Sequence, residues 1–339
     1  MKAYQLNSIN DLKYESIAIP DLQSGWCLVK VKAAGICSSD VPRIFNKGTY
    51  HFPTIPGHEF SGVVVKVADQ EHESWIGKRV GVFPLIPCKE CEPCLEHQYE
   101  MCKNYDYIGS RRDGAFAEYV LVPIWNLIEL PKNISYEEAA MLEPLSVALH
   151  ALKRAKLKKG NHVGIIGTGM IGFAAAQWAK SLGAAKVIVI GRNMIKKNLA
   201  KRIGVEYIEL SDCSDELSFD VVIEAVGSND SISQSISFTK SGGRIVLMGN
   251  PEGDINLSQD LYWKILRKQI TVTGTWNSAY ENSLPCDWTE AVSAISEKKI
   301  NVLSLITHKF SQQQLSEGLE LMRNHTEPYC KVMTIWNEV

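Results

Sequence analysis

A glycine-rich turn between two apolar runs constrains the fold of this chain more than any other feature. Residues 163–166 are apolar, the turn 167–172 has the pattern Gly-x-Gly-x-x-Gly, and residues 173–182 are rich in alanine. A strand, a tight turn and a helix in this order place unpaired helical N–H groups where they bind an anion such as a pyrophosphate. We therefore predict a dinucleotide site formed by Gly167, Gly169, Met170, Ile171 and Gly172.

Each glycine of this turn has its own expected task. Gly167 permits the turn, Gly169 lets the pyrophosphate approach the backbone, and Gly172 lets the helix and the strand pack closely. A glycine-rich turn can also be a plain connection between two elements. Here a helix is expected at 170–182, and a second apolar run at 186–190 ends where a residue that contacts the ribose would stand, so the nucleotide site is favoured.

The region around this turn alternates strands and helices. Between residues 149 and 285 we expect strands, with helical or capping patterns between most of them, at 163–166, 187–190, 207–210, 220–224, 244–248 and 270–273. Strands and helices that alternate in this way form a doubly wound parallel sheet, the Rossmann fold. The chain is thus predicted to be an α/β protein with a dinucleotide-binding domain at 149–285.

The end of the second expected strand bears on the choice between NAD and NADP. An enzyme selective for NAD commonly has an acidic residue there, whose carboxylate accepts the ribose hydroxyls. This chain has Gly191, followed by Arg192. Arg192, with Lys196 or Lys197 behind it, can pair with the 2′-phosphate of NADP. The sequence therefore favours NADP, and NAD stays possible because Arg192 can instead cover the adenine.

Four cysteines in one short stretch predict a metal site. They have the spacing Cys88-x2-Cys91-x2-Cys94-x7-Cys102. Short spacings let one loop supply all four thiolates of a tetrahedral zinc site. The competing iron–sulfur pattern has three residues before its last cysteine and a proline after it, whereas here the last spacing is seven and a lysine follows. Four thiolates fill the coordination sphere, so we expect a structural zinc ion.

Residues 1–148 are rich in strand patterns. Runs with many β-branched residues lie at 26–33, 62–68 and 117–122, separated by glycine and proline turns. A helix is first indicated at Ser135, where Ser-Tyr-Glu-Glu has the form of a capping box. The tail, residues 286–339, contains a helical segment and strands at 303–310 and 331–336, and we expect it to join this first domain.

A second metal site is predicted from separate stretches of the first domain. Cys37 and His58 supply a thiolate and an imidazole, and Glu143 is the preferred carboxylate, with Glu59 as the alternative. Singly, such residues are more often part of a core. Together they match a catalytic zinc site, which takes three protein ligands of mixed type and leaves one position open. Asp40 is placed to accept the other ring N–H of His58.

Composition excludes several classes of partner. The chain has 339 residues, which suggests two domains, and a formal net charge of −2, so we expect no nucleic acid partner. The N-terminus has no apolar signal core, and no apolar run approaches the roughly 20 residues of a membrane span. Nine cysteines in a chain without a secretion signal favour metal binding over disulfides. We therefore expect a cytoplasmic protein without a membrane partner.

These motifs together resemble the zinc-dependent medium-chain alcohol dehydrogenases, over essentially the whole chain. The resemblance implies a GroES-like catalytic domain at 1–148 and 286–339, two zinc ions per chain, and a homodimer or homotetramer. Glutamate at 143, where aliphatic alcohol dehydrogenases have cysteine, favours the polyol branch. The motifs are Gly-x-Cys37-x-Ser39-Asp40, Gly57-His58-Glu59-x2-Gly62, the four-cysteine stretch, Asp113-Gly114-x-Phe116-Ala117-Glu118-Tyr119, Glu143-Pro144 and the nucleotide turn.

The resemblance also implies a reaction. Zinc acts as a Lewis acid on the substrate hydroxyl and lowers its pKa, Ser39 carries the proton towards solvent, and hydride passes to the nicotinamide. The segments 42–45, 107–114 and 264–268 are similar to the galactitol-1-phosphate dehydrogenases of the polyol branch. A phosphorylated polyol would need cations, and the candidates are Arg43, Arg111 and Arg112.

Other functions stay open on the sequence. The substrate can instead be a free polyol or a threonine-like alcohol, such as sorbitol, L-idonate or L-threonine. A zinc-free quinone or enone reductase would not need Cys37, His58 or Glu143. A non-catalytic NADPH-binding protein would be expected to lack a ligand of the open zinc site, and none is missing.

Overall fold

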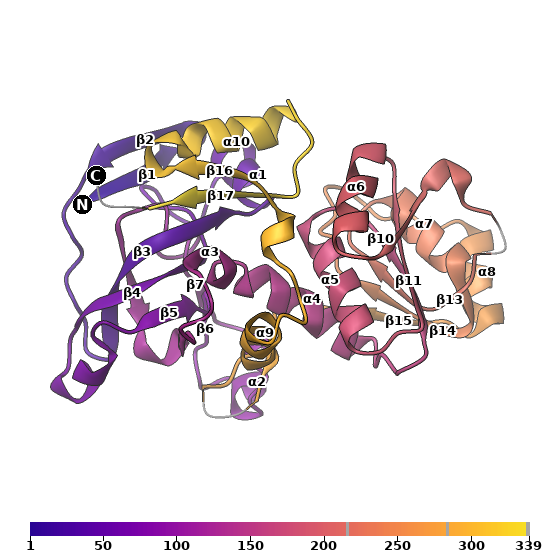
Figure 1. Ribbon diagram of the computed structural model, residues 1–339, viewed down its shortest axis with the longest axis horizontal. Helices are drawn as coiled ribbons and strands as arrows, with labels where there is room; N and C mark the ends of the chain where they lie inside the picture. The colour runs from indigo at the N-terminus through magenta and orange to yellow at the C-terminus, as the bar shows by residue number, and fades with distance from the viewer. Residues whose placement is uncertain (215–216, 283–284, 337–339) are drawn as a thin grey trace. The chain divides into compact units, whose positions relative to one another are not determined.

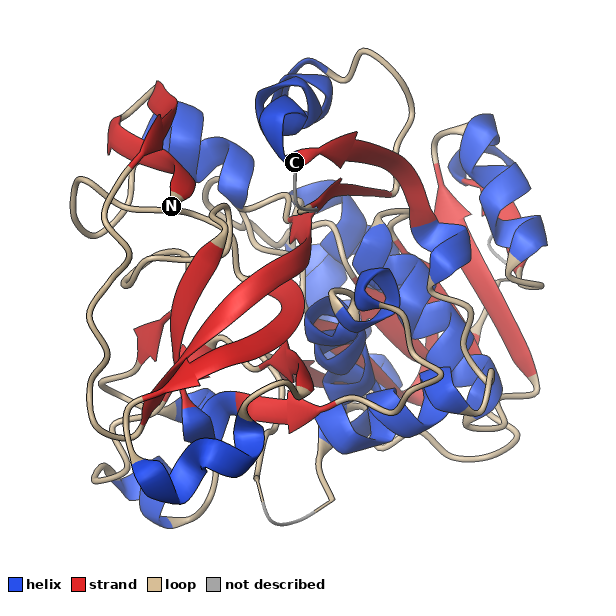
Figure 2. Ribbon diagram, turned by 60° about the vertical axis from the view of Figure 1, so that its left-hand side comes forward, coloured by secondary structure: helices blue, strands red, loops and turns tan. Residues whose placement is uncertain are grey.

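The computed structural model describes residues 1–214, 217–282 and 285–336 (Figures 1 and 2). The chain forms two compact units. Unit 1 contains Met1–Glu143, Ala279–Ser296 and Ile306–Val339, and unit 2 contains Pro144–Ser278 and Glu297–Leu305. The domain limit expected at 148/149 falls within helix α4 (Leu142–Arg154), a continuous helix that crosses from unit 1 into unit 2.

A seven-stranded sheet forms the centre of unit 1. Its order is β16-β17-β3-β4-β5-β9, and β8 pairs with β3. The apolar residues of these strands pack into one core, which includes Val29, Val64 and Trp336. The strands are β3 (Trp26–Ile36), β4 (Glu59–Val67), β5 (Arg79–Val82), β8 (Tyr119–Pro123), β9 (Leu127–Glu129), β16 (Ile306–Ser311) and β17 (Lys331–Ile335).

Two strands from the tail of the chain, β16 and β17, enter this sheet. β17 pairs antiparallel with β3, with Val332 opposite Ile36. The capping box at Ser135 is also present, because Ser135 Oγ accepts from the Glu138 N–H at 3.2 Å and Glu138 Oε2 accepts from the Ser135 N–H at 2.8 Å. It begins only a short helix, α3 (Tyr136–Ala139), and the longer α4 follows.

The remaining elements of unit 1 are short. They are β1 (Lys2–Ser8), β2 (Asp11–Ser16), α1 (Asp40–Pro42), a π-helical turn (Arg43–Lys47), β6 (Leu85–Ile86), α2 (Glu92–Leu95), β7 (Asp106–Tyr107), α9 (Asp287–Ser296) and α10 (Leu315–Asn324), with 3-10 turns at Gln70–Trp75, Tyr99–Met101, Ile124–Asn126 and Gln312–Gln314.

Unit 2 is built on a six-stranded sheet whose neighbouring strands are all parallel. Its order is β12-β11-β10-β13-β14-β15. Numbered within the unit, this is the order 3-2-1-4-5-6 of a Rossmann fold, so the predicted fold class is confirmed. The strands are β10 (His162–Ile166), β11 (Lys186–Gly191), β12 (Glu206–Glu209), β13 (Phe219–Glu224), β14 (Thr239–Leu247) and β15 (Thr271–Gly274).

The helices of unit 2 alternate with these strands. The predicted helix after the glycine turn is present as α5, and its alanine-rich face is buried. The others are α6 (Met194–Arg202), α7 (Asn229–Phe238) and α8 (Gln259–Lys268), and α5 spans Met170–Ser181. In the part of the chain that the structure describes, no helix has both the length and the apolar character of a membrane span.

Candidate active site

Two adjacent strands of unit 1 bring three metal-binding side chains together. Cys37 follows the last residue of β3, and His58 and Glu59 stand at the start of β4. The strands pair antiparallel with Gly35 opposite Glu59, so the end of one meets the start of the other. One ligand atom from each of Cys37, His58 and Glu59 lies within 4.8 Å of the others. Sulfur, nitrogen and oxygen donors in this arrangement fit a catalytic zinc ion.

Glu143 stands beside this group of three and not within it. It is the second residue of α4, and Tyr107 Oη donates a hydrogen bond to its Oε1 at 3.3 Å. Burial raises the pKa of Glu143 to about 7, although the nearby His58 lowers it. The structure therefore places both predicted carboxylates, Glu59 and Glu143, around His58. The assignment of either one as the zinc ligand stays a prediction.

Asp40 lies behind the ring of His58. Its Oδ1 is 3.6 Å from His58 Nδ1, which is within ion-pair distance but longer than a hydrogen bond. Asp40 also accepts the Cys37 N–H at 3.0 Å. Burial lowers the pKa of His58, but Asp40 and Cys37 outweigh it and raise that pKa well above its ordinary value. The arrangement favours a charged His58 until a cation replaces the proton.

Ser39 contacts the first predicted ligand directly. Its hydroxyl donates to Cys37 Sγ at 3.3 Å, and the side chain is partly exposed. A hydroxyl between the thiolate and solvent is suited to carry a proton outward. The relay role predicted for Ser39 is compatible with this position and stays a prediction.

Lys331 is a residue of this site that the sequence analysis missed. Its ammonium pairs with Glu59 Oε2 and donates to the Ile36 carbonyl at 3.2 Å. Burial lowers the pKa of Lys331, but Glu59 and Cys37 raise it above the ordinary value. A lysine inside the apolar tail strand 331–335 was the available signal, because a buried lysine requires an acidic partner.

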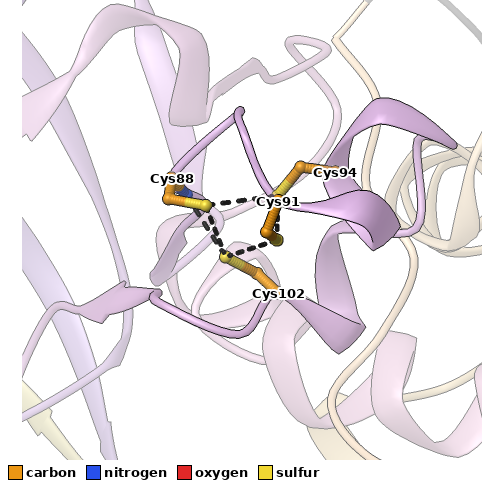
Figure 3. A group of neighbouring side chains, drawn as sticks. All are labelled: Cys88, Cys91, Cys94 and Cys102. Atoms are coloured by element: carbon orange, nitrogen blue, oxygen red, sulfur yellow. Dashed lines mark hydrogen bonds between the residues drawn. The ribbon is translucent and has the colours of Figure 1, made fainter.

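The four cysteines of the second metal site converge as predicted (Figure 3). Sulfur–sulfur distances are 3.5 Å for Cys91–Cys94 and Cys88–Cys102, and 3.9 Å for Cys88–Cys94 and Cys91–Cys102. A tetrahedron with Zn–S bonds of about 2.3 Å has edges of about 3.8 Å. The sulfur atoms are too far apart for disulfides, and they fit the shell of one zinc ion.

Backbone N–H groups support these thiolates. The Cys88 N–H donates to Cys102 Sγ at 3.3 Å, and the Lys103 N–H donates to Cys91 Sγ at 3.5 Å. The second contact lowers the pKa of Cys91 to about 6, whereas burial raises the pKa of Cys94. The loop thus favours at least one thiolate before a metal binds.

Arg111 contacts two tyrosines from different loops of unit 1. Its guanidinium lies 4.4 Å from the ring centre of Tyr50 and 4.3 Å from that of Tyr105, and Nη1 donates to the Tyr105 carbonyl at 2.9 Å. Two cation–π contacts hold the side chain in place. Arg111 therefore joins two loops of unit 1, and its predicted role at a substrate phosphate stays a prediction.

The other two predicted phosphate ligands are also paired within the chain. Arg43 Nη1 donates to Asp40 Oδ1 at 2.7 Å, and Arg112 Nε donates to Asp106 Oδ2 at 2.5 Å. Arg43 thus supports the carboxylate behind His58. In the described part of the chain, Arg43, Arg111 and Arg112 each bind a different partner. These contacts therefore add no support for a phosphate site formed by the three arginines.

The glycine turn of unit 2 has the three properties that its sequence predicts. Gly167 has a φ of 122°, which favours glycine. A Cβ at Gly172 would lie 2.1 Å from the Gly167 carbonyl oxygen, whereas a Cβ at Gly169 would meet nothing within 4 Å. Gly169 caps α5, so the N–H groups of Met170 and Ile171 belong to its first turn. The turn fits a pyrophosphate, and binding by these residues stays a prediction.

Glu224 shapes the neighbouring turn and was also missed. It ends β13, is fully buried, and its Oε1 accepts the N–H groups of Val226 and Gly227, both at 2.8 Å. A Cβ at Gly167 would lie 3.1 Å from the Ala225 carbonyl oxygen. The carboxylate therefore fixes a turn that packs against the glycine turn. An acid at the end of an apolar strand was the available signal.

Gly191 and Arg192 lie where the sequence places them. Gly191 is the last residue of β11, and the exposed Arg192 follows it. β11 is next to β10 in the parallel sheet, so both strands end at the same edge as the glycine turn.

Comparisons with known proteins identify the family of this chain. The family model for the alcohol dehydrogenase GroES-like domain matches residues 23–132, and that for zinc-binding dehydrogenases matches residues 171–297. The chain is 35% identical to galactitol 1-phosphate 5-dehydrogenase of Escherichia coli K12, covering 87% of this chain and 89% of that protein. It is 29% identical to sorbitol dehydrogenase of Bacillus subtilis, covering 99% and 98%.

Solved structures extend this result. Galactitol-1-phosphate dehydrogenase from Escherichia coli superimposes with a TM-score of 0.91 at 32% identity, covering 99% of this chain and all of that one. A zinc-binding dehydrogenase from Sinorhizobium meliloti solved with NADP has a TM-score of 0.90 at 28% identity, covering 98% of each chain. A dehydrogenase from Escherichia coli CFT073 solved with NADH has a TM-score of 0.90 at 26% identity, covering 99% of each. The chain belongs to the zinc-dependent medium-chain dehydrogenase family, alongside polyol dehydrogenases, and is a zinc-containing NAD(P)-dependent alcohol dehydrogenase.

Proposed function

We propose that this enzyme transfers hydride between a secondary alcohol of a polyol or polyol phosphate and NAD(P). The observation that carries the proposal is the convergence of Cys37, His58 and Glu59, with Glu143 beside them. Residues 1–148 with 286–339 would form the catalytic domain, and residues 149–285 would bind the cofactor.

The side chains have distinct tasks in this proposal. Cys37, His58 and one of the two glutamates hold the zinc ion, which supplies Lewis-acid chemistry that lowers the pKa of the substrate hydroxyl. Ser39, in contact with Cys37, carries the released proton towards solvent. Asp40 orients His58, as the outer partner of a metal-binding histidine does.

Galactitol 1-phosphate is the first substrate to test. The identity of 35% to an enzyme named for that substrate supports it, whereas the contacts of Arg43, Arg111 and Arg112 do not add support. The alternative is a free polyol or a threonine-like alcohol, such as sorbitol, L-idonate or L-threonine. A rate of cofactor reduction on galactitol 1-phosphate well above that on galactitol would support the phosphate ester. Equal or higher rates on galactitol would refute it and leave the zinc mechanism standing.

Two zinc ions per chain and a preference for NADP complete the cofactor proposal. The two groups of ligands support the metal count. Gly191 and Arg192 support NADP because no acidic residue repels the 2′-phosphate there. Metal analysis of the purified protein and titrations with NADPH and NADH test these two statements separately.

We further propose a homodimer or homotetramer that uses the outer edge of β15. β15 is the last strand of its sheet, and Val272 on β15 and Trp263 on the preceding helix α8 are each 43% exposed. An edge strand has unpaired backbone N–H and C=O groups that can pair with a second copy. Light scattering should show that Val272→Lys lowers the oligomer mass, whereas Val65→Lys, at a position 37% exposed on β4, should not. An unchanged mass in Val272→Lys would exclude this edge.

A further inference from the structure

A tyrosine from β12 holds the turn that follows β11. Tyr207 Oη accepts the Asn193 N–H at 3.0 Å and donates to the Asn193 carbonyl at 2.9 Å. One side chain therefore satisfies both backbone polar groups of a single residue. Asn193 directly follows Arg192, so these two hydrogen bonds also fix the backbone that carries the Arg192 guanidinium.

The same hydroxyl fills the space in front of Gly191. A Cβ at Gly191 would lie 2.9 Å from Tyr207 Oη and 2.3 Å from Thr168 Cγ2. Both distances are far below van der Waals contact, and Thr168 belongs to the glycine turn. A side chain at position 191 would thus displace the side chains of Thr168 and Tyr207. In the present arrangement, these two side chains occupy the space that an acidic residue at position 191 would need.

These residues meet at one edge of the sheet. Gly191 pairs in register with Glu209, and Val189 pairs with Tyr207. Strands of a parallel sheet end at the edge where a dinucleotide binds, and the adenosine end lies beyond the second strand. Tyr207 therefore stands where selectivity between NAD and NADP is decided. Burial raises the pKa of Tyr207, so the phenol keeps its proton and can donate.

We propose that Tyr207 is the positioning residue that sets the cofactor selectivity of this enzyme. Tyr207 holds the backbone beside Arg192, so that the guanidinium can bind the 2′-phosphate of NADP. Its hydroxyl also occupies the space beside Gly191 in which an acidic side chain would bind the ribose of NAD. This inference rests on the proposed dinucleotide site at the glycine turn. Because the pyrophosphate contacts are common to both cofactors, loss of the two hydrogen bonds weakens the binding of NADP more than that of NAD.

Tyr207→Phe in the full-length, zinc-loaded enzyme tests the proposal. Dissociation constants for NADPH and NADH are measured by fluorescence titration without substrate, so the result does not depend on turnover. Both hydrogen bonds form within the protein, so their loss acts by freeing the backbone of Asn193 beside Arg192. Ordering one residue again on binding costs about 1–2 kcal/mol, which predicts a roughly tenfold rise for NADPH, with a rise of less than about twofold for NADH. Tyr262→Phe, which removes the hydroxyl of an exposed tyrosine on α8, is the control.

The ratio of the two constants decides the outcome. An unchanged ratio in Tyr207→Phe would overturn the role of Tyr207. If the wild-type enzyme binds NADH more tightly than NADPH, the proposed preference for NADP fails. A change in the ratio of the two dissociation constants in Tyr207→Phe would still support Tyr207 as the residue that sets selectivity. The two failures are therefore distinguishable in one set of titrations.

Gly191→Asp tests the exclusion of the acid. Alone, it should weaken the binding of both cofactors by about tenfold or more, because the new Cβ displaces Thr168 and Tyr207. With Thr168→Ser and Tyr207→Phe added, the two nearest crowding atoms are gone and only the ring carbon Cε2 of residue 207, at 3.1 Å, has to give way, so the triple variant should bind NADH more tightly than NADPH. Tight NADH binding by Gly191→Asp alone would contradict the proposed exclusion.

Discussion

Glu59 and Lys331 form a buried ion pair beside the predicted zinc ligands. The carboxylate stands at the start of β4 and the ammonium on β17, and their side chains are only 2% and 4% exposed. Burial removes both charges from water, so each charge depends on the other. Lys331 thus fixes the position of the Glu59 carboxylate relative to Cys37 and His58.

Lys331→Met should leave the carboxylate of Glu59 without a partner. We expect the free energy of unfolding of the zinc-free protein to fall by about 3 kcal/mol, measured by urea denaturation. The double variant Glu59→Gln/Lys331→Met should recover most of this loss, because neither charge remains. Lys309→Met, which removes a half-exposed partner of Glu137, should change stability by less than about 1 kcal/mol. Equal losses in the single and double variants would show that the pair is not the cause.

Cys94→Ser should remove one zinc ion per chain and lower stability. The substitution deletes one of four sulfur donors that lie 3.5 to 3.9 Å apart. We expect the thermal midpoint to fall by at least about 5 °C, since a four-thiolate site contributes directly to folding. Cys213→Ser, outside both metal sites, is the matched control. Undiminished zinc content in Cys94→Ser would contradict the structural site.

Glu143 should make the zinc-free protein less stable as the pH rises. Burial raises its pKa from 4.5 to about 7, so between these values the folded state binds more protons than the unfolded state. Its contribution is fully present below about pH 4.5 and declines by about 1.4 kcal/mol per pH unit until the pH passes 7. Urea denaturation from about pH 5 to about pH 8 should show this decline in the wild type and a smaller one in Glu143→Gln. If the free energy of unfolding changed with pH in the same way in the wild type and in Glu143→Gln, the Glu143 carboxyl would not be held neutral in the folded protein.

Local sequence patterns predicted most of the architecture. Apolar runs punctuated by glycine located the strands of the Rossmann sheet, and the spacing of Cys88 to Cys102 located the four-thiolate cluster. The helix after Gly169 followed from the same turn. These features depend on neighbours in the sequence, so periodicity and spacing are sufficient to find them.

The contacts that the sequence analysis missed join distant segments. Lys331 reaches Glu59 only because β17 and β4 both pair with β3. Tyr207 reaches Asn193 only because β12 pairs with β11. Such pairings are set by strand register, which one sequence does not reveal. The pairing of Arg43 with Asp40, three residues earlier, was within reach of sequence reasoning, because oppositely charged residues at that spacing commonly meet.

The most direct test of the catalytic zinc site compares Cys37→Ser with the wild type. Initial rates of nicotinamide reduction are measured on galactitol 1-phosphate and on galactitol, together with the zinc content and the dissociation constant for NADPH. We predict a loss of turnover of at least about a thousandfold, with unchanged NADPH binding and with the zinc ion of the four-cysteine cluster retained. Full turnover by Cys37→Ser with only that one zinc ion bound would contradict the assignment of Cys37 and His58 to a catalytic metal.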